Sequence, residues 1–371
     1  MIRPDVSMRI AALLVVTALA ACSSNTLRRT GEVPRRLSAE DVPAAIAGAE
    51  QALAEGRADV ALEWMYRAGE VPGLPPSQRN RIQALLEVSA DVRIEQLSGE
   101  DADPGDLSDL LGVGLPRQIA VSAGIRAARM WTERGEFQRA VEVLRRTDEL
   151  FPTHHERAAA GSLLAQAGLA LSHDDSGFWL FYSAREQGMA ALEYLVLHYP
   201  HEPLGAQAYW RLTEMYEEDA LWATAIDRHK ELVWAFPASE LVPASLARIP
   251  ALRLAALSSP EYDRGALVLA RSELEAWLAD YAGHDSEGEV RAALTDCLRR
   301  LAASDIGIAR FYERVDNPFG VRLHAERAVL EAERAGDEGL AARARELLAG
   351  LEPGDGADDL PDADAEEEET R

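Results

Sequence analysis

The sequence predicts an all-α protein, built as an α-solenoid of stacked helical hairpins. Segments rich in Ala and Leu alternate with short polar gaps, and alternating Val/Ile/Thr runs are missing, which favours helix over strand. An aromatic residue followed by proline ends a predicted helix at Phe151–Pro152, Tyr199–Pro200 and Phe236–Pro237, and Tyr281–Ala282 is a decayed copy. A unit that recurs in this way, without strands between its copies, is typical of helical repeat proteins.

Composition limits the function. The 371 residues are 47% hydrophobic and carry a formal net charge of −25. That charge argues against nucleic-acid binding, which needs a basic surface, and disfavours a broad electrostatic contact with anionic lipid headgroups. The two cysteines, Cys22 and Cys297, are too few for a disulfide framework, and we expect Cys297 to be a small buried residue on a helix.

Residues 1–21 have the pattern of a signal peptide. Arg3 and Arg9 precede an apolar run, residues 10–20, which is too short for a comfortable transmembrane helix. The run ends in Leu19-Ala20-Ala21-Cys22, which resembles a bacterial lipobox. We therefore expect Cys22 to be acylated, as in palmitate-bearing lipoproteins, and to become the first residue of the mature chain. An ordinary secretory signal with a coincidental cysteine is the alternative.

The resemblance to a lipobox also implies a compartment. Ser23 follows the cysteine, whereas an Asp there would have suggested retention at the inner membrane. We expect a lipoprotein anchored on the periplasmic face of the outer membrane, with residues 22–40 as its tether. Translation could start at Met1 or at Met8, since either leaves a complete signal.

Residues 41–189 are predicted to form N-terminal helical repeats. Asp41 is placed to cap the first helix of a hairpin that covers residues 41–68, and Ser77 is placed to cap a long helix that ends near Leu97. The aromatic run at residues 178–182 is either core or a contact between repeats, or else an exposed binding strip.

Residues 116–152 resemble the tetratricopeptide repeat. Ala128 and Trp131 occupy the small and aromatic positions of the first helix, Gly135 the turn, and Ala140 the position where the second helix approaches closely. Pro152 follows Ala140 by 12 residues, and the same interval separates two further pairs. These pairs are Ala225 with Pro237 and Ala270 with Ala282.

In residues 190–350 we expect more repeats of this type. A helix over residues 239–257 should be interrupted or kinked near Pro243 and Pro250. A nearly continuous helix is expected over residues 286–315, followed by two shorter ones. Residues 351–371 are predicted to be a disordered acidic tail, either a solubilising segment or one that docks to a partner.

We find no catalytic constellation and no metal site in the sequence, and no cofactor is expected. His154 and His155 are adjacent and, on a helix, would point about 100° apart, so they cannot chelate one ion together. His284 with Asp285, and His324 with Glu326, lack a third ligand nearby. We therefore expect a protein that is not an enzyme.

From about Ala190 to Leu330 the chain resembles the BamD family, the lipoproteins of the outer-membrane β-barrel assembly machinery. Three segments carry this resemblance. They are Leu197–Pro200 with Pro203, Leu204, Gln207, Ala208 and Ala225–Arg228; Ala270–Leu274 with Asp280–Tyr281; and Arg300–Ala302 with Ile308–Arg314. The last resembles the family's long helix that ends in an aromatic pair and a basic residue.

The resemblance implies a lipid-anchored protein of about five repeats that binds the periplasmic POTRA domains of a BamA-like β-barrel protein, with other assembly lipoproteins as further partners. It makes Phe311, Tyr312 and Arg314 candidates for partner binding. Their alternative is that the aromatics are core residues and the arginine an ordinary surface side chain. The chain departs from the family at residues 315–319, where Arg-Gly-aromatic is usual, and in the additional hairpins of residues 41–189.

Three functions follow from these observations. The first is a non-enzymatic scaffold, anchored by lipid, in the outer-membrane protein assembly complex. The second is a repeat lipoprotein that serves as an envelope adaptor for secretion, pilus or peptidoglycan machinery. The third, an enzyme such as a peptidoglycan hydrolase, would need a perturbed carboxylate buried in a deep cleft.

Overall fold

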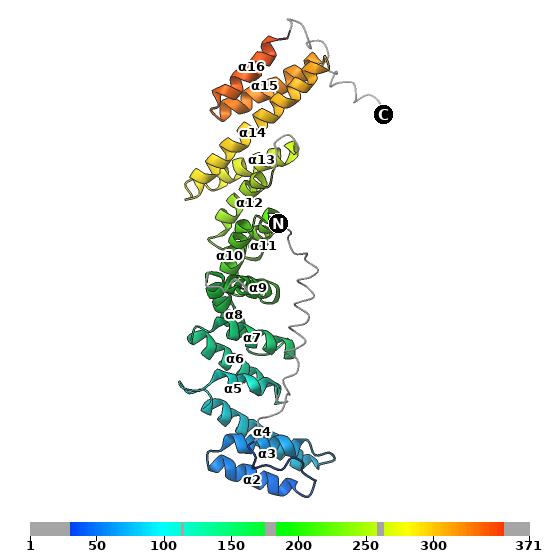
Figure 1. Ribbon diagram of the computed structural model, residues 1–371, viewed down its shortest axis with the longest axis vertical. Helices are drawn as coiled ribbons and strands as arrows, with labels where there is room; N and C mark the ends of the chain where they lie inside the picture. The colour runs from blue at the N-terminus through cyan, green and yellow to red at the C-terminus, as the bar shows by residue number, and fades with distance from the viewer. Residues whose placement is uncertain (1–29, 113–114, 175–182, 258–262, 352–371) are drawn as a thin grey trace, which may run out of the picture. The chain divides into compact units, whose positions relative to one another are not determined.

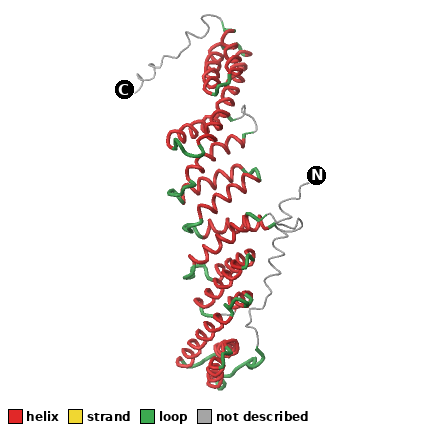
Figure 2. The backbone as a smooth tube through the Cα atoms, turned by 90° about the vertical axis from the view of Figure 1, so that its left-hand side faces the viewer, coloured by secondary structure: helices red, strands yellow, loops and turns green. Residues whose placement is uncertain are grey.

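The computed structural model describes residues 30–112, 115–174, 183–257 and 263–351. Every regular element in these residues is helical, and Figure 2 shows no strand among them, so the predicted all-α fold is confirmed. None of the described helices has the length and hydropathy needed to cross a bilayer. Several predictions lie outside the described residues: the signal peptide with Cys22, the aromatic run 178–182, and the acidic tail from residue 352 onwards.

The chain forms two compact units, Met1–Ala191 and Leu192–Arg371, which divide within helix α9. Each unit is a stack of antiparallel helices, which Figure 1 labels in chain order. The helices up to the division are α2 (Val42–Ala54), α3 (Ala58–Gly69), α4 (Pro76–Gln96), α5 (Pro104–Asp109), the 3-10 turn η1 (Leu110–Gly112), α6 (Arg117–Glu133), α7 (Phe137–Leu150), α8 (Arg157–Ser172) and α9 (Ala184–His198). Those that follow are α10 (Gly205–Glu218), α11 (Trp222–Ala235), α12 (Val242–Ala256), α13 (Arg264–Asp280), α14 (Glu287–Arg314), α15 (Pro318–Arg334) and α16 (Glu338–Ala349).

One type of turn joins many consecutive helices. The backbone amide after the turn donates to the carbonyl five residues earlier, which is the Schellman closure of a helix end. The turn residue takes a left-handed backbone, with φ of +74° at Gly135 as the sequence predicts, and of +56° at Ala220 and +55° at Asp316. The same closure recurs in the pairs Arg57 to Ala52, Glu136 to Trp131, Leu221 to Tyr216, Asn317 to Tyr312 and Asp337 to Ala332.

A second type of turn contains the recurring aromatic residue. Its amide donates to the carbonyl four residues earlier, and its own carbonyl accepts the amide three residues later. Phe151, Tyr199, Phe236 and Tyr281 all make both hydrogen bonds. Tyr281 does so although alanine follows it, so the aromatic residue is the constant part of this turn and proline is an accessory.

The core positions predicted for a tetratricopeptide-like hairpin are buried. In the pair α6–α7, Ala128 and Ala140 are fully buried and Trp131 is 5% exposed. Ala225 and Ala270, the predicted equivalents of Ala140, are also fully buried. Small side chains at these positions let antiparallel helices approach closely, and stacked tetratricopeptide-like hairpins result.

Three local expectations were wrong. The carboxylate of Asp41 accepts hydrogen bonds from the amide and hydroxyl of Ser38 instead of capping α2, and these bonds lower its pKa below the usual range. Ser77 lies inside α4, whose N-cap is Pro75. The expected interruption of α12 is absent: Pro243 lies in its first turn, where a missing amide costs little, and Pro250 lies inside the helix without ending it. A kink at Pro250 stays a prediction.

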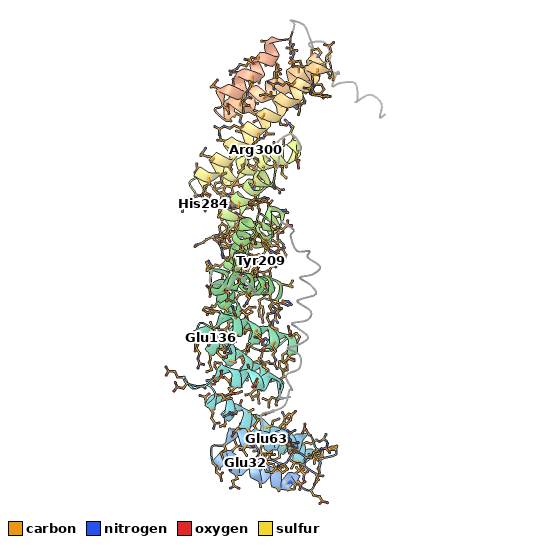
Figure 3. All side chains as sticks on the ribbon, viewed as in Figure 1. Glu32, Glu63, Glu136, Tyr209, His284 and Arg300 are labelled. Atoms are coloured by element: carbon orange, nitrogen blue, oxygen red, sulfur yellow. The ribbon has the colours of Figure 1, made fainter. Side chains whose placement is uncertain are left out.

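The first described residues are docked on α3. The amide and the hydroxyl of Thr30 both donate to Oε2 of Glu63 at 2.7 Å, and Glu63 is fully buried. Val33 is 2% exposed, and Arg57 pairs with Glu32. Figure 3 labels both glutamates at the first hairpin. The predicted tether, residues 22–40, therefore contacts the fold at Thr30, Glu32 and Val33.

Charged side chains connect helices that are distant in sequence. Glu217 on α10 lies 3.3 Å from Nε2 of His229 on α11 and pairs with Arg248 on α12. Burial opposes ionisation of Glu217, but the hydrogen bonds from His229 and Arg248 outweigh it, and the pKa lies below its usual value. Burial, reinforced by a hydrogen bond to Glu193, raises the pKa of Tyr216 to about 12.

Replacing Ala225 by Trp should destabilise the second unit. The alanine is fully buried in a cluster with Ile226, Ile249 and Leu252, so a larger side chain must separate α11 from α12. Overpacking of this kind costs ~1–3 kcal/mol or more, and each kcal/mol corresponds to a fall in Tm of roughly 2–4 °C for a unit of this size. Thermal unfolding followed by circular dichroism measures the change.

Ala223→Trp is the matched control, because Ala223 is exposed on the same helix. Its Tm should stay near that of the parent protein. Equal effects of the two substitutions would show that Ala225 is not at a close helix crossing.

Candidate protein-interaction surface

Helix α14 is 28 residues long and presents one side to solvent. Its inward side contributes Leu298, Leu301, Ala302, Ile306 and Ala309 to the core. Its outward side becomes apolar and basic toward the C-terminal end, which contains the three residues that the sequence nominates for partner binding. The structure places those three residues in different environments.

Phe311 and Arg314 are on the surface, whereas Tyr312 is half-buried. The Phe311 side chain is 49% exposed, and its ring meets Tyr312 edge to face at 5.6 Å between centroids. Arg314 is exposed in the last turn, where a cation is favoured by the helix dipole. The alternative, that both aromatics are core residues, therefore does not hold for Phe311, which is exposed. Tyr312 is packed against its neighbours.

Tyr312 packs against two residues of α15, Gly320 and His324, and we call this contact the Tyr312 clamp. Gly320 lies so close that a Cβ at this position would be 2.6 Å from Cδ1 of Tyr312. On α15 the ring of His324 stacks on Tyr312, with centroids 5.6 Å apart and planes 16° apart. Glycine is therefore needed at position 320 so that the tyrosine ring can lie against the helix.

A buried carboxylate holds His324 in this position. Nδ1 of His324 lies 2.7 Å from Oδ1 of Asp305, and Nη2 of Arg264 donates to Oδ2 of the same residue at 2.8 Å. Asp305 is fully buried, so both oxygens need such partners. The chain of contacts Arg264–Asp305–His324–Tyr312 connects α13, α14 and α15, and the ring of Phe311 meets its last member.

The residues of the outward side form what we call the α14 surface. It comprises Ala303, Gly307, Arg310, Phe311, Arg314 and Val315, all of them exposed. Arg310 and Arg314 have no hydrogen-bond or ion-pair partner among the described residues. A Cβ at Gly307 would meet nothing within 4 Å, so this part of the helix is open. Val315 is 53% exposed beside Phe311, which makes the surface apolar and basic together.

The described histidines do not assemble a metal site. No group of three or more His, Cys, Asp or Glu side chains in the described residues is placed to hold a metal ion. His154 and His155 lie in the turn between α7 and α8 and not on a helix, because Phe151 and Pro152 have already ended α7. His154 is 4% exposed and its Nε2 lies 3.0 Å from Oδ1 of Asp148. His324 pairs with Asp305 and not with the neighbouring Glu326.

Cys297 is buried, as expected. Its thiol donates to the carbonyl of Leu267 at 3.2 Å, and burial raises its pKa to about 11. The other nominated cysteine, Cys22, lies outside the described residues.

Most residues of the α14 surface were not identified from the sequence, nor was the pair Asp305 and His324 that positions Tyr312. Ala303, Gly307, Arg310 and Arg314 recur at helical spacing along α14 and could have been found as a stripe without carboxylates. Asp305 and His324 are 19 residues apart, and no sequence pattern pairs them.

Comparisons with known proteins give the following. No family model matches the chain, and no curated protein matches it. Solved structures that align with it include a tetratricopeptide repeat protein from Parabacteroides merdae ATCC 43184, 13% identical, over 84% of this chain and 98% of that one, with a TM-score of 0.22. Another is the TPR2AB-domain:pHSP90 complex of yeast Sti1, 12% identical over the same shares of the two chains, with a TM-score of 0.24. At TM-scores this low, the two likenesses indicate nothing about the function of this chain.

Gly320→Ala should loosen the clamp on Tyr312. The added methyl group cannot coexist with the ring, so Tyr312 or α15 must move, at a cost of ~1–3 kcal/mol. Gly307→Ala is the matched control, since its methyl group would enter open space and a glycine inside a helix costs roughly 0.5–1 kcal/mol relative to alanine. Thermal unfolding should therefore give opposite shifts in Tm, and shifts of the same sign and size would contradict the clamp.

Proposed function

We propose that this protein is a non-enzymatic scaffold that binds a partner protein through the α14 surface. The observation that carries the proposal is the exposure of Phe311 and Val315 beside two arginines that have no partner among the described residues. The helix that presents them is held by the contacts of Asp305 with His324 and of His324 with Tyr312. Aromatic residues and arginine are the side chains that most often dominate binding energy at protein interfaces. A surface held rigid before binding also loses less conformational entropy when a partner docks.

The partner we propose is a POTRA-type domain of a BamA-like β-barrel assembly protein, in an outer-membrane assembly complex. The support is the BamD-like sequence from Ala190 to Leu330, which includes Phe311, Tyr312 and Arg314, and the tetratricopeptide-like hairpins that contain it. An apolar and basic surface suits a partner that offers an apolar pocket bordered by carboxylates.

We further propose that Cys22 is acylated and holds the protein on the periplasmic face of the outer membrane. Multiple acyl chains, at about 0.8 kcal/mol per buried methylene, would anchor it stably. Because Thr30 docks on Glu63, only eight residues, 22–29, separate the membrane from the fold, with the acylated Cys22 as the first of them. Such a length of chain spans at most ~28 Å. The first hairpin would therefore stay close to the bilayer.

Cys22→Ser should leave the protein without lipid and release it from the membrane fraction, because the acylated thiol is lost. Metabolic labelling with palmitate and fractionation of the envelope measure both effects. Cys297→Ser is the control and should retain label and membrane. Palmitate incorporation that survives Cys22→Ser would refute the anchor.

A photoreactive amino acid in place of Phe311 should capture the partner in intact envelopes. We expect adducts with an outer-membrane β-barrel protein that carries POTRA domains. The matched control is the same amino acid in place of Leu330, which is 56% exposed on α15 but lies outside the α14 surface. Adducts only with secretion, pilus or peptidoglycan components would favour the envelope-adaptor function. Equal adducts from both positions would contradict a specific surface.

A further inference from the structure

The segment after α16 is strongly acidic, whereas the charged side chains of the α14 surface are both arginines. Residues 353–371 contain nine acidic side chains and one arginine, a net charge of −8 within the −25 of the whole chain. The positive charges of the α14 surface, Arg310 and Arg314, have no partner among the described residues. The charges of the two segments are therefore complementary.

The direction of α16 brings the start of this segment to the end of α14 that contains Phe311. Nε of Arg299 on α14 lies 3.5 Å from Oδ2 of Asp337, at the start of α16. Because the chain reverses at α15 and again at α16, α14 and α16 run in the same direction, and Figure 1 shows α16 returning toward the junction of α14 and α15. Twelve residues beyond Arg299 and Asp337 the two helices reach Phe311 and Ala349, each after about 18 Å of helix.

The core of this bundle agrees with that alignment. Ala302 and Ile306 of α14 share a buried cluster with Leu340, Ala341 and Ala344 of α16. These positions lie between the Arg299–Asp337 pair and the ends of the two helices. The chain therefore leaves the bundle at the same end as the α14 surface.

We propose that residues 352–371 dock in cis on the α14 surface and compete there with the partner. The competition rests on the proposed function, because it assumes that a partner binds the α14 surface. The docking itself does not. Twenty residues reach up to ~70 Å when extended, far more than the width of a helix bundle. Attachment to α16 gives the segment an effective concentration on the order of millimolar, so a weak contact is enough to occupy the surface.

The side chains around Arg310 set the position of this contact. Glu313 and Asp316 are exposed nearby and would repel the segment. At 100° per residue, Glu313 projects about 60° from Arg310 on the side opposite Phe311, and Asp316 lies beyond the helix end. The contact is therefore directed to the strip that contains Arg310, Arg314 and Phe311. Exposed ion pairs are individually weak and are screened by salt, so the docking is reversible.

A zero-length carbodiimide crosslink in the full mature chain tests the docking. Lys230 is the only lysine of the protein, so Arg314→Lys adds a single side-chain amine and keeps the charge. We expect mass spectrometry to find isopeptide bonds from position 314 to carboxylates of residues 355–369. Arg327→Lys is the matched control, because Arg327 is exposed on α15 outside the α14 surface.

The expected result is at least a fivefold higher yield for Arg314→Lys than for Arg327→Lys in low salt, lost in 1 M NaCl, where the Debye length is about 3 Å. Equal yields, or no link to the segment, would overturn the docking. No partner protein is needed here, so a failed partner capture leaves this result interpretable.

Replacing Glu366–Glu369 by Gln tests the competition. If the segment occupies the α14 surface, this variant should raise partner capture from position 311 severalfold, while capture from position 330 stays at background. Unchanged capture of a partner that the parent protein does capture would overturn the competition.

Discussion

The close crossing of two helices at a buried alanine is the constraint on which this structure depends. Ala140, Ala225 and Ala270 are fully buried because the helices that meet there leave no room for a larger side chain. Close crossings require turns that reverse the chain within a few residues. Two turn types provide them: the Schellman closure with a left-handed residue, and the aromatic turn whose carbonyl accepts the amide three residues later. Each turn satisfies backbone groups that a helix end would otherwise leave unpaired.

Ion pairs connect helices whose residues lie far apart in the sequence. Arg248 meets Glu217, and Arg271 meets Glu331, across 31 and 60 residues of sequence. The forked guanidinium suits such bridges because it binds carboxylates in a fixed geometry, and the chain uses arginine almost exclusively, with Lys230 as its single lysine. Between α13, α14 and α15 the carboxylate of such a bridge is buried: Asp305 binds both Arg264 and His324, and the histidine ring stacks on Tyr312.

Features that depend on residues close together in the sequence could be predicted from it. Helix positions, the turn at Gly135 and the buried alanines follow from spacing, propensity and the recurring aromatic residue, and the structure confirms them. Contacts that depend on the register between helices were not accessible, since neither Asp305 with His324 nor Thr30 with Glu63 has a sequence signature. The prediction for Asp41 failed because its carboxylate accepts hydrogen bonds from Ser38 and does not cap α2. Phe311 was ambiguous because an aromatic residue on a helix serves equally well in a core or at an interface.

Two arginines without a partner in the part of the chain that the structure describes, Arg310 and Arg314, distinguish the end of α14 from an ordinary helix surface. An exposed arginine at a helix C-terminus is already stabilised by the helix dipole, so Arg314 alone would need no partner. Arg310 lies one turn earlier, and together the two flank an aromatic side chain that remains 49% exposed. Leaving such a side chain in water forgoes the free energy of burying it, about 25 cal/mol for each Å² of apolar surface. This free energy is therefore available to whichever segment covers the α14 surface, whether a partner protein or the acidic residues that follow α16.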